Sequence, residues 1–360
     1  MNDVRELKRF GFAHARAQGI PAARYREVCG RIDTDTGAED GSWAGEWTRA
    51  AEALARDGRP LDACGHYNLA RFPYVADQAR QEAQDRCVAA FGTWAAERPD
   101  IRRLELAVPG GTVRCWTSGL STREPRPLLV VMGGIVSVKE QWAPLLARIG
   151  RLGLAGVVTE LPGVGEHTGL YTVDSWRVLG ALLDTLADRA QVAETYVLAM
   201  SFGGHLALRC AGTDPRVRGV VTAGAPVTEF FTDPAWQSRL PRVTTDTLAH
   251  LTGTKVESMG SWALTDDDLT AVDVPVYYVA SRRDEITPPG DATRVRDHVR
   301  DAHFLTYDED HASPRYAAET RAWIMLALLR LLGTRPVPRA VAGTLRRVLH
   351  ARRLIVERVA

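Results

Sequence analysis

Residues 195–212 read T-Y-V-L-A-M-S-F-G-G-H-L-A-L-R-C-A-G, and the rest of the chain can be placed around them. The apolar residues 196–199 predict a short buried strand, and residues 203–211 predict a helix. Ser201 lies at the corner between the two. A serine on such a tight turn lifts its Oγ clear of the sheet and leaves backbone N–H groups facing an oxyanion. The stretch therefore predicts a nucleophile elbow with Ser201 as the nucleophile.

The elbow departs from the usual G-x-S-x-G pattern at one position. Ala199 stands where the first glycine is expected, whereas Gly203 and Gly204 keep the helix side of the turn open. Glycines are used there because larger side chains would clash across the turn, and alanine is the smallest departure. A serine between a strand and a helix can also be purely structural, so the remaining chain has to decide its role.

Composition and charge exclude several classes of protein. With 360 residues the chain is long enough for one large domain or two ordinary ones. Its net charge of +1 gives no electrostatic reason to expect nucleic acid as a partner. We expect a cytoplasmic protein with reduced thiols, because there is no signal-peptide pattern, no apolar run long enough for a bilayer, and no C-x-x-C spacing. The scattered cysteines are Cys29, Cys64, Cys87, Cys115 and Cys210.

Residues 1–98 have helical periodicity and almost no strand signal. Helices are predicted at residues 3–18, 21–32, 42–57, 60–71 and 75–97. We interpret this segment as a helical cap domain. Its aromatic side chains are expected to form the core of the helical bundle and its contact with the rest of the chain. The alternative is that Tyr67, Phe72 and Tyr74 also line a substrate pocket beneath the cap.

Residues 99–333 alternate between apolar strands and helices. Strands are predicted at residues 101–108, 112–117, 128–132, 156–160, 196–199, 219–223, 274–280 and 303–307. Helices are predicted at residues 142–152, 173–190, 203–211, 291–300 and 314–332. The first two strands flank Pro109-Gly110-Gly111, which is typical of a hairpin. The pattern predicts an α/β fold with a mainly parallel sheet flanked by helices.

Two further segments interrupt or follow this alternation. Residues 225–270 carry no clear element and are interpreted as a lid-like insertion. Residues 334–360 form a basic C-terminal helix with an apolar stripe. We expect this helix to pack on the body of the protein or on a second subunit of a homodimer. The alternative is a docking surface for an acidic protein such as an acyl carrier protein.

The partners that a serine nucleophile needs follow in a characteristic order. A base must take the proton of the serine, and a third group must orient that base. Asp284 comes just after the predicted strand 274–280, and His311 comes just after the strand 303–307. The order Ser, Asp, His at strand ends is that of the α/β-hydrolase fold. The sequence predicts a Ser201–Asp284–His311 triad, with Glu285 as the competing acid.

The oxyanion of such a reaction needs two N–H donors. One is predicted to be the backbone N–H of Phe202, directly after the nucleophile. The other is expected from the turn after residues 128–132, with Gly134 preferred and Ile135 as the alternative. The sequence shows no metal-ligand spacing and no phosphate-binding loop, so we expect no metal and no cofactor.

Four motifs carry a resemblance to a known family. They are M-G-G-I-V-S-V-K-E at residues 132–140, E-L-P-G-V-G-E at 160–166, M-S-F-G-G-H at 200–205 and D-E-I-T-P-P at 284–289. Together with the helical N-terminal segment they resemble the FrsA-like α/β-hydrolases. In chain length and triad spacing the chain is most similar to 2,6-dihydroxypseudooxynicotine hydrolase, and also to fungal hydrolases that shorten polyketide pigment precursors. Glu160 departs from the aspartate expected before P-G-x-G.

The resemblance implies a serine-dependent hydrolase that cleaves a carbon–carbon bond next to a ketone, or an ester, in a small or polyketide-like molecule. It also implies a capped pocket, for which Tyr67, Phe72 and Ile135 are candidate lining residues. Cleaving a carbon–carbon bond leaves a carbanion that needs a proton source. Glu229 is the candidate for that acid and Asp233 the second, unless both are ordinary loop carboxylates. The alternatives are an acyl-enzyme cyclase or acyltransferase, and a non-catalytic binding protein of the same fold.

Overall fold

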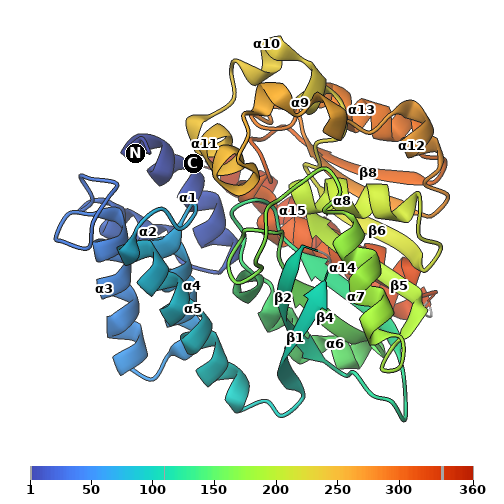
Figure 1. Cartoon of the computed structure of the whole chain (residues 1–360), viewed down its shortest axis with the longest axis horizontal. Helices are drawn as coiled ribbons and strands as arrows, with labels where there is room; N and C mark the ends of the chain where they lie inside the picture. The colour runs from blue at the N-terminus through green and yellow to red at the C-terminus, as the bar shows by residue number, and fades with distance from the viewer. Residues whose placement is uncertain (1, 109, 334–335, 360) are drawn as a thin grey trace.

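The computed structural model describes residues 2–108, 110–333 and 336–359. A helical part at the N-terminus lies beside an α/β part built on one sheet (Figure 1). Residue 109 of the predicted hairpin turn and residues 334–335 of the predicted C-terminal segment lie outside the described residues. In Figure 1, α2 to α5 gather on one side of the sheet, and α1 and α11 lie where the two parts meet.

The helical part contains five helices close to the predicted positions. They are α1 (Val4–Ala17), α2 (Ala22–Cys29), α3 (Trp43–Arg56), α4 (Pro60–Arg71) and α5 (Gln78–Ala96). Three of them begin at residues whose side chains accept backbone N–H groups of the first turn, which are Asp3, Ser42 and Asp77. Such N-caps are local signals, which is why the helix starts could be predicted within a few residues.

Aromatic rings fill the centre of this helical part, α1 to α5, which corresponds to the predicted cap and is called the cap below. Trp43 lies 6.2 Å from both Trp47 and Phe72, measured between ring centroids, and all three are almost completely buried. The predicted role of the aromatic residues as core of the bundle is confirmed for these three. A buried ion pair joins Arg80 of α5 to Asp35 at 2.6 Å and fixes the loop between α2 and α3.

The α/β part is a single sheet of eight strands in the order β1-β2-β4-β3-β5-β6-β7-β8. The strands are β1 (Ile101–Val108), β2 (Gly111–Ser118), β3 (Pro127–Met132), β4 (Ala155–Thr159), β5 (Gln191–Met200), β6 (Val217–Ala223), β7 (Val276–Ser281) and β8 (Ala302–Tyr307). Only β2 runs antiparallel to its neighbours β1 and β4 among the described pairs. The predicted α/β-hydrolase fold, with a mainly parallel sheet and an N-terminal helical region, is confirmed.

Helices cover both faces of this sheet (Figure 1). The longer ones are α7 (Arg177–Leu186), α8 (Phe202–Ala211), α13 (Pro289–His298) and α14 (Ala317–Leu331). The single helix predicted at residues 142–152 is wrong. The chain there forms η1 (Lys139–Gln141), η2 (Ala143–Leu145), α6 (Leu146–Ile149) and η3 (Gly150–Leu152). Pro144 lacks an N–H group and so cannot continue an α-helix that begins before it.

The insertion at residues 225–270 consists of short helices. They are α9 (Glu229–Thr232), α10 (Pro234–Gln237), α11 (Arg242–Thr252), η4 (Val256–Ser258), η5 (Gly260–Trp262) and α12 (Asp266–Thr270). The insertion contacts the cap through α11. Glu6 of α1 accepts the N–H group of Val243 at 2.9 Å, and Tyr74 stacks on His250 with ring centroids 4.5 Å apart.

The basic helix α15 (Pro336–Val359) packs on α14. Ala342 of α15 is buried in a small apolar cluster with Leu326 and Leu329 of α14. The predicted apolar stripe does not face the body of the protein, because its members in the described part are 45–63% exposed. These members are Val341, Leu345 and Val348. The helix thus packs on the body of the protein, as the first expectation had it, and a partner for the exposed stripe stays a prediction.

We expect Gly203→Ala to destabilise the fold by about 1–3 kcal/mol. A Cβ on Gly203 would lie 2.5 Å from the carbonyl oxygen of Gly133, which is backbone and cannot rotate away. Urea denaturation measures the loss. The matched control is Gly343→Ala in α15, where a Cβ would meet nothing within 4 Å. That variant should be neutral or more stable by about 0.5–1 kcal/mol. Equal stability of the two variants would contradict the close approach.

Candidate active site

Ser201 lies on a strained turn at the centre of the sheet. It connects β5 to α8 with φ 52° and ψ −125°. A non-glycine residue with positive φ is costly and is kept only where the surroundings enforce it. The N–H group of Ser201 donates to the carbonyl of Ala223 at the end of β6, at 2.8 Å. Ala199 is fully buried between Met132 and Thr222 of the neighbouring strands, which leaves little room for a larger side chain.

Asp284 and His311 meet beyond the ends of β7 and β8. The Nδ1 atom of His311 lies 2.9 Å and 2.8 Å from the two carboxylate oxygens of Asp284. Oδ1 of Asp284 also accepts the N–H groups of Ile286 and Thr287, at 2.9 Å and 2.8 Å. These bonds fix the carboxylate, and the carboxylate fixes the imidazole ring with Nε2 on its opposite edge.

The imidazole ring of His311 lies next to the serine turn. Gly224 follows Ala223, whose carbonyl binds the N–H group of Ser201. A Cβ on Gly224 would lie only 2.8 Å from Cε1 of His311. Within the described residues, neither Ser201 Oγ nor His311 Nε2 has a hydrogen-bond partner, and neither belongs to the buried unpaired atoms. Catalytic hydrogen bonds often tighten only when substrate is bound.

The surroundings of His311 favour its charged form. Burial disfavours the imidazolium, but the charge of Asp284, the hydrogen bond to that carboxylate and the charge of Glu285 outweigh the effect of burial. The pKa of His311 is therefore raised above its ordinary value of 6.5. A base of this kind holds a proton firmly once it has taken it from the nucleophile.

Glu285, the competing acid in the sequence, has a different place. Its Oε2 accepts the backbone N–H group of His311 at 2.9 Å, and its Oε1 lies 3.1 Å from Arg9 of α1. Ala312 and Ser313 then adopt positive φ values of 62° and 46°. The loop that carries His311 is thus held by a tight turn and by the first helix of the chain.

The predicted oxyanion donors lie on both sides of Ser201. Phe202 is the first residue of α8, so its N–H group has no partner within the helix. A Cβ on Gly134 would lie 3.4 Å from Ser201 Oγ, which shows how closely the turn after β3 approaches the serine. Ile135 follows in the same turn and is 7% exposed. The choice between Gly134 and Ile135 as second donor stays open.

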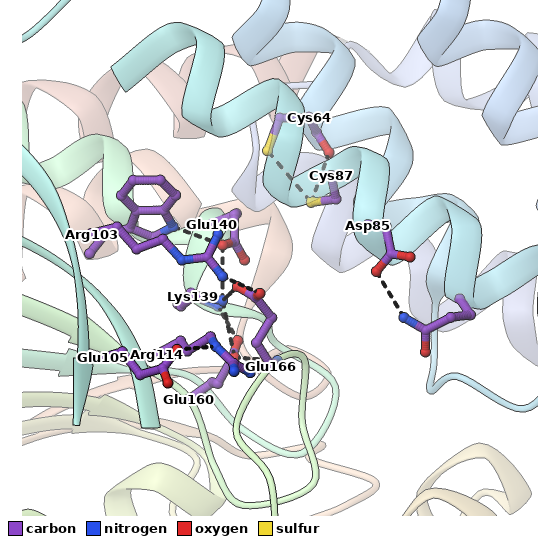
Figure 2. Close-up of polar contacts among 12 residues, drawn as sticks. Cys64, Asp85, Cys87, Arg103, Glu105, Arg114, Lys139, Glu140, Glu160 and Glu166 are labelled. Carbon is purple, nitrogen blue, oxygen red and sulfur yellow. Dashed lines mark hydrogen bonds and ion pairs between the residues drawn. The ribbon is translucent and has the colours of Figure 1, made fainter. Parts of the chain in front are cut away.

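A cluster of buried charges holds the loop that contains Gly134. The Nζ atom of Lys139 lies 3.0 Å from Glu140, 3.2 Å from Glu160 and 2.8 Å from Glu166 (Figure 2). The carboxylate of Glu160 also accepts the N–H groups of Lys139 and Glu166, at 2.8 Å and 2.6 Å. The loop after β3 is thereby joined to the loop after β4.

The cluster is buried and densely paired. Lys139, Glu140 and Glu160 have no exposed side-chain surface. Burial alone would lower the pKa of Lys139, but the three carboxylates raise it. Burial raises the pKa of Glu160 to about 6, although Lys139 opposes that shift. The family resemblance suggested aspartate at position 160, and the longer glutamate here accepts two backbone N–H groups at once.

His14 of α1 is a residue near the site that the sequence analysis did not identify. Its ring lies 5.1 Å from that of Phe72, and its Nδ1 lies 3.3 Å from Oε1 of Gln141, at the end of the loop that contains Gly134. It also lies within electrostatic range of His311. No spacing rule relates position 14 to position 311, so only the folded arrangement could reveal it.

The predicted pocket residues of the cap have different surroundings. Phe72 is 2% exposed and packs between Trp43 and His14. Tyr67 is buried, and its pKa is raised by burial while the charges of Arg86 and Glu52 also act on it. No hydrogen bond or ring contact joins Tyr67 to the predicted triad within the described residues.

Glu229 lies at the start of α9. Its carboxylate oxygens lie about 2 Å from the point that a Cβ on Gly290 would occupy, so the carboxylate rests on the first turn of α13. Asp291 accepts the N–H group of Glu229 at 2.6 Å and those of three neighbours of Glu229 in the same turn. In the described part of the chain, no hydrogen bond joins Glu229 to Ser201, Asp284 or His311.

Neither a metal centre nor a membrane-spanning helix is found among the described residues. No group of three or more His, Cys, Asp or Glu side chains in this part of the chain is placed to hold a metal ion. The helices that the structure describes are all too short or too polar to cross a membrane. His205, the other histidine close to the serine in sequence, has its Nε2 2.9 Å from the carbonyl oxygen of Trp262.

Comparison with known proteins places the chain in a family. The family model described as "Esterase FrsA-like" matches residues 22–283. The chain belongs to the esterase FrsA-like family. Esterase FrsA of Photobacterium profundum is 25% identical over 286 residues, which are 71% of this chain and 68% of that protein. Esterase FrsA of Salmonella newport is 29% identical over 240 residues, which are 61% of this chain and 58% of that protein.

Solved structures support the same fold. AbyA5 (wild type) is 50% identical, with a TM-score of 0.92 over 97% of this chain and 100% of that chain. The 2,6-dihydroxy-pseudo-oxynicotine hydrolase is 20% identical, with a TM-score of 0.67 over 94% of this chain and 96% of that chain. This FrsA-like chain is thus a hydrolase by family, and its matched region ends one residue before Asp284. The roles of Asp284 and His311 rest on geometry.

We expect Asp284→Asn to move the rising limb of the pH profile of kcat/KM to lower pH. His311 must be neutral to accept a proton, and Asp284 favours the charged form, so activity appears only as the pH rises through a raised pKa. Losing the carboxylate should lower that midpoint and also the maximal rate. Initial rates on a phenyl ester between about pH 5 and pH 9 measure it. Asp308→Asn is the control, because Asp308 pairs with Arg283 instead. An unchanged midpoint in Asp284→Asn would refute the pairing.

We expect Lys139→Met to destabilise the protein by about 3–5 kcal/mol, because it leaves buried carboxylates without a cation. The matched control is Arg103→Met, which removes a half-exposed partner of the same Glu166 and should cost less than about 1 kcal/mol. The pKa of Glu160 is raised in the folded protein, so protonation of Glu160 favours the folded state as the pH falls through about 6. The loss of stability caused by Lys139→Met should therefore shrink over that pH range. Denaturation at two pH values tests this. Similar losses of stability in both variants would contradict the stabilising role of Lys139 in the buried charge cluster.

Proposed function

We propose that the chain is a serine hydrolase that cleaves an ester in a small or medium-sized substrate. Ser201 Oγ attacks the carbonyl carbon while His311 Nε2 takes the hydroxyl proton, and Asp284 stabilises the imidazolium. The N–H group of Phe202 and that of Gly134 or Ile135 receive the negative charge on the carbonyl oxygen. The proposed chemistry needs no metal and no cofactor.

The second half of the reaction uses the same groups in reverse. His311 gives its proton to the departing alkoxide, which leaves as an alcohol and an acyl group bound to Ser201. A water molecule then loses a proton to His311 and attacks the acyl carbon, so that a carboxylic acid and the free serine are formed. The observation that carries the proposal is the two-oxygen pairing of Asp284 with His311, directly beside a serine on a strained turn.

Carbon–carbon cleavage next to a ketone is the other reaction that the family resemblance suggested. It requires an acid near the leaving carbon, because a carbanion is a much poorer leaving group than an alkoxide. Glu229, the candidate for that acid, rests on Gly290 in the first turn of α13. The likeness to 2,6-dihydroxy-pseudo-oxynicotine hydrolase supports the fold and not the reaction. Ester cleavage is therefore the function that the site favours.

We expect Ser201→Ala to lower kcat on an activated phenyl ester by at least about three orders of magnitude, because it removes the attacking oxygen. The same variant should no longer be labelled by a fluorophosphonate. Ser238→Ala, at an exposed serine of the insertion, is the matched control and should keep both activity and labelling. Near-normal turnover in Ser201→Ala would show that the covalent mechanism is wrong.

The mass of the product separates the remaining possibilities in the same experiment. A free carboxylic acid indicates hydrolysis, whereas a cyclic ester or a transferred acyl group indicates a cyclase or acyltransferase. Cleavage of a β-diketone with the efficiency of the ester would instead support carbon–carbon hydrolysis. Labelling without turnover on any of these substrates would favour a binding protein that has kept the fold.

A further inference from the structure

Helix α1 places a second imidazole, that of His14, against Gln141 of the loop after β3 and within electrostatic range of His311. α1 contacts the segment that follows His311, and Arg9 on the same helix pairs with Glu285 at 3.1 Å. His14 lies further along α1 and is partly exposed. Because α1 is fastened to the loop of the catalytic base, the position of His14 relative to His311 is set by direct contacts.

A chain of amide groups determines which ring nitrogen of His14 carries the proton. Gln18 donates from Nε2 to the carbonyl of His14 at 3.1 Å, so its Oε1 must face the other way. That oxygen accepts the Nδ2–H group of Asn68 at 2.9 Å. Asn68 Nδ2 also donates to Oε1 of Gln141, at 3.5 Å. Gln141 therefore presents an acceptor to Nδ1 of His14, and Nδ1 must be the protonated nitrogen.

The other nitrogen of His14 is consequently an acceptor. A neutral imidazole has one N–H group, so Nε2 carries a lone pair. Burial lowers the pKa of His14 to about 4, the hydrogen bond with Gln141 opposes that shift, and the charges of Arg71 and His311 reinforce it. The ring is neutral at neutral pH, and a positive charge on His311 during the reaction keeps it so.

Nε2 of His14 is also free to receive a ligand. Among the described residues it has no hydrogen-bond partner, and it does not belong to the buried unpaired atoms. His66 of α4 makes a useful contrast, because its unpaired Nε2 is buried. Ser201 Oγ and His311 Nε2 are likewise unpaired among the described residues and do not belong to the buried unpaired atoms. Within the described residues, these three polar atoms are thus unpaired and not fully buried, and His14 lies within electrostatic range of His311.

We propose that His14 is a specificity-determining residue whose Nε2 accepts a hydrogen bond from a hydroxyl group of the substrate, close to the carbonyl that Ser201 attacks. The substrate class is then a hydroxy ester, and the inference rests on the proposed ester hydrolysis at Ser201. Nε2 without a proton can accept a hydrogen bond from a hydroxyl group, but it forms none with an ether oxygen of similar size. A site built for a hydroxyl group rejects analogues that lack it, because the bound analogue shields the polar atom from water and leaves it unpaired.

The test uses two esters that differ only in the donor. Phenyl 3-hydroxybutanoate offers an O–H group, and phenyl 3-methoxybutanoate keeps the oxygen without the proton. For the unmodified chain we expect kcat/KM to favour the hydroxy ester by about 10- to 100-fold. His14→Asn, which keeps a donor near the position of Nδ1 but removes Nε2, should bring the ratio close to one. His14→Phe, which keeps a ring beside Phe72, should do the same.

A matched variant and a binding experiment make the result decisive. His66→Asn changes another cap histidine, which is 4% exposed, and should keep the ratio. Binding of both esters to Ser201→Ala, with and without His14→Asn, gives the same ratio without turnover. If the unmodified chain hydrolyses neither ester but still binds the hydroxy ester more tightly, and this preference depends on His14, the proposed function is refuted. The inference about His14 then still stands. An unmodified protein without preference, or a preference unchanged in both His14 variants, would overturn the inference.

Discussion

The arrangement of the site depends on the buried ion pairs of the Lys139 ammonium group. This group joins the loop after β3 to carboxylates of its own segment and of the loop after β4. The loop after β3 makes two contacts that matter for the site. Gly134 lies against Ser201, and the side chain of Gln141 contacts His14. A change in the position of the loop would therefore disturb both Gly134, a predicted oxyanion donor, and the contact with His14 of α1.

Burying so much charge is an expensive way to hold a loop, and the same loop receives a second buried cation. Arg71 of α4 donates to the carbonyl oxygen of Val136 at 2.7 Å and to that of Pro73 at 2.9 Å, and burial lowers its pKa to about 10. An apolar replacement of buried charges is often as stable, so their presence here points to positional accuracy. Hydrogen bonds to backbone carbonyls fix the path of the loop in a way that apolar contacts do not.

Sequence reasoning succeeded where the signal is local. Strand β1 and helix α4 have the predicted bounds, and the pairing of Asp284 with His311 follows from the order of residues at strand ends. It failed where the deciding contact is distant in the chain. His14 could not be identified because its neighbours are defined by the docking of α1, and the partners of Lys139 come from two loops. The two cases differ in how far apart in the sequence the deciding residues lie. Helix N-caps and strand alternation depend on residues a few positions apart, whereas the docking of a helix depends on residues far away in the chain.

The contact between α1 and the loop of His311 also has a consequence for the timing of synthesis. α1 leaves the ribosome before the α/β part, yet Arg9 binds Glu285, and the carbonyl groups of Arg16 and Ala17 receive the guanidinium of Arg321. Glu285 is translated after β7, and Arg321 is translated after β8, the last strand of the sheet. Helix α1 can therefore make these contacts only after most or all of the sheet has been synthesised. A nascent chain thus carries Ser201 at first without His311 and without a docked α1, and the proposed triad is complete only once the segment after β8 has emerged.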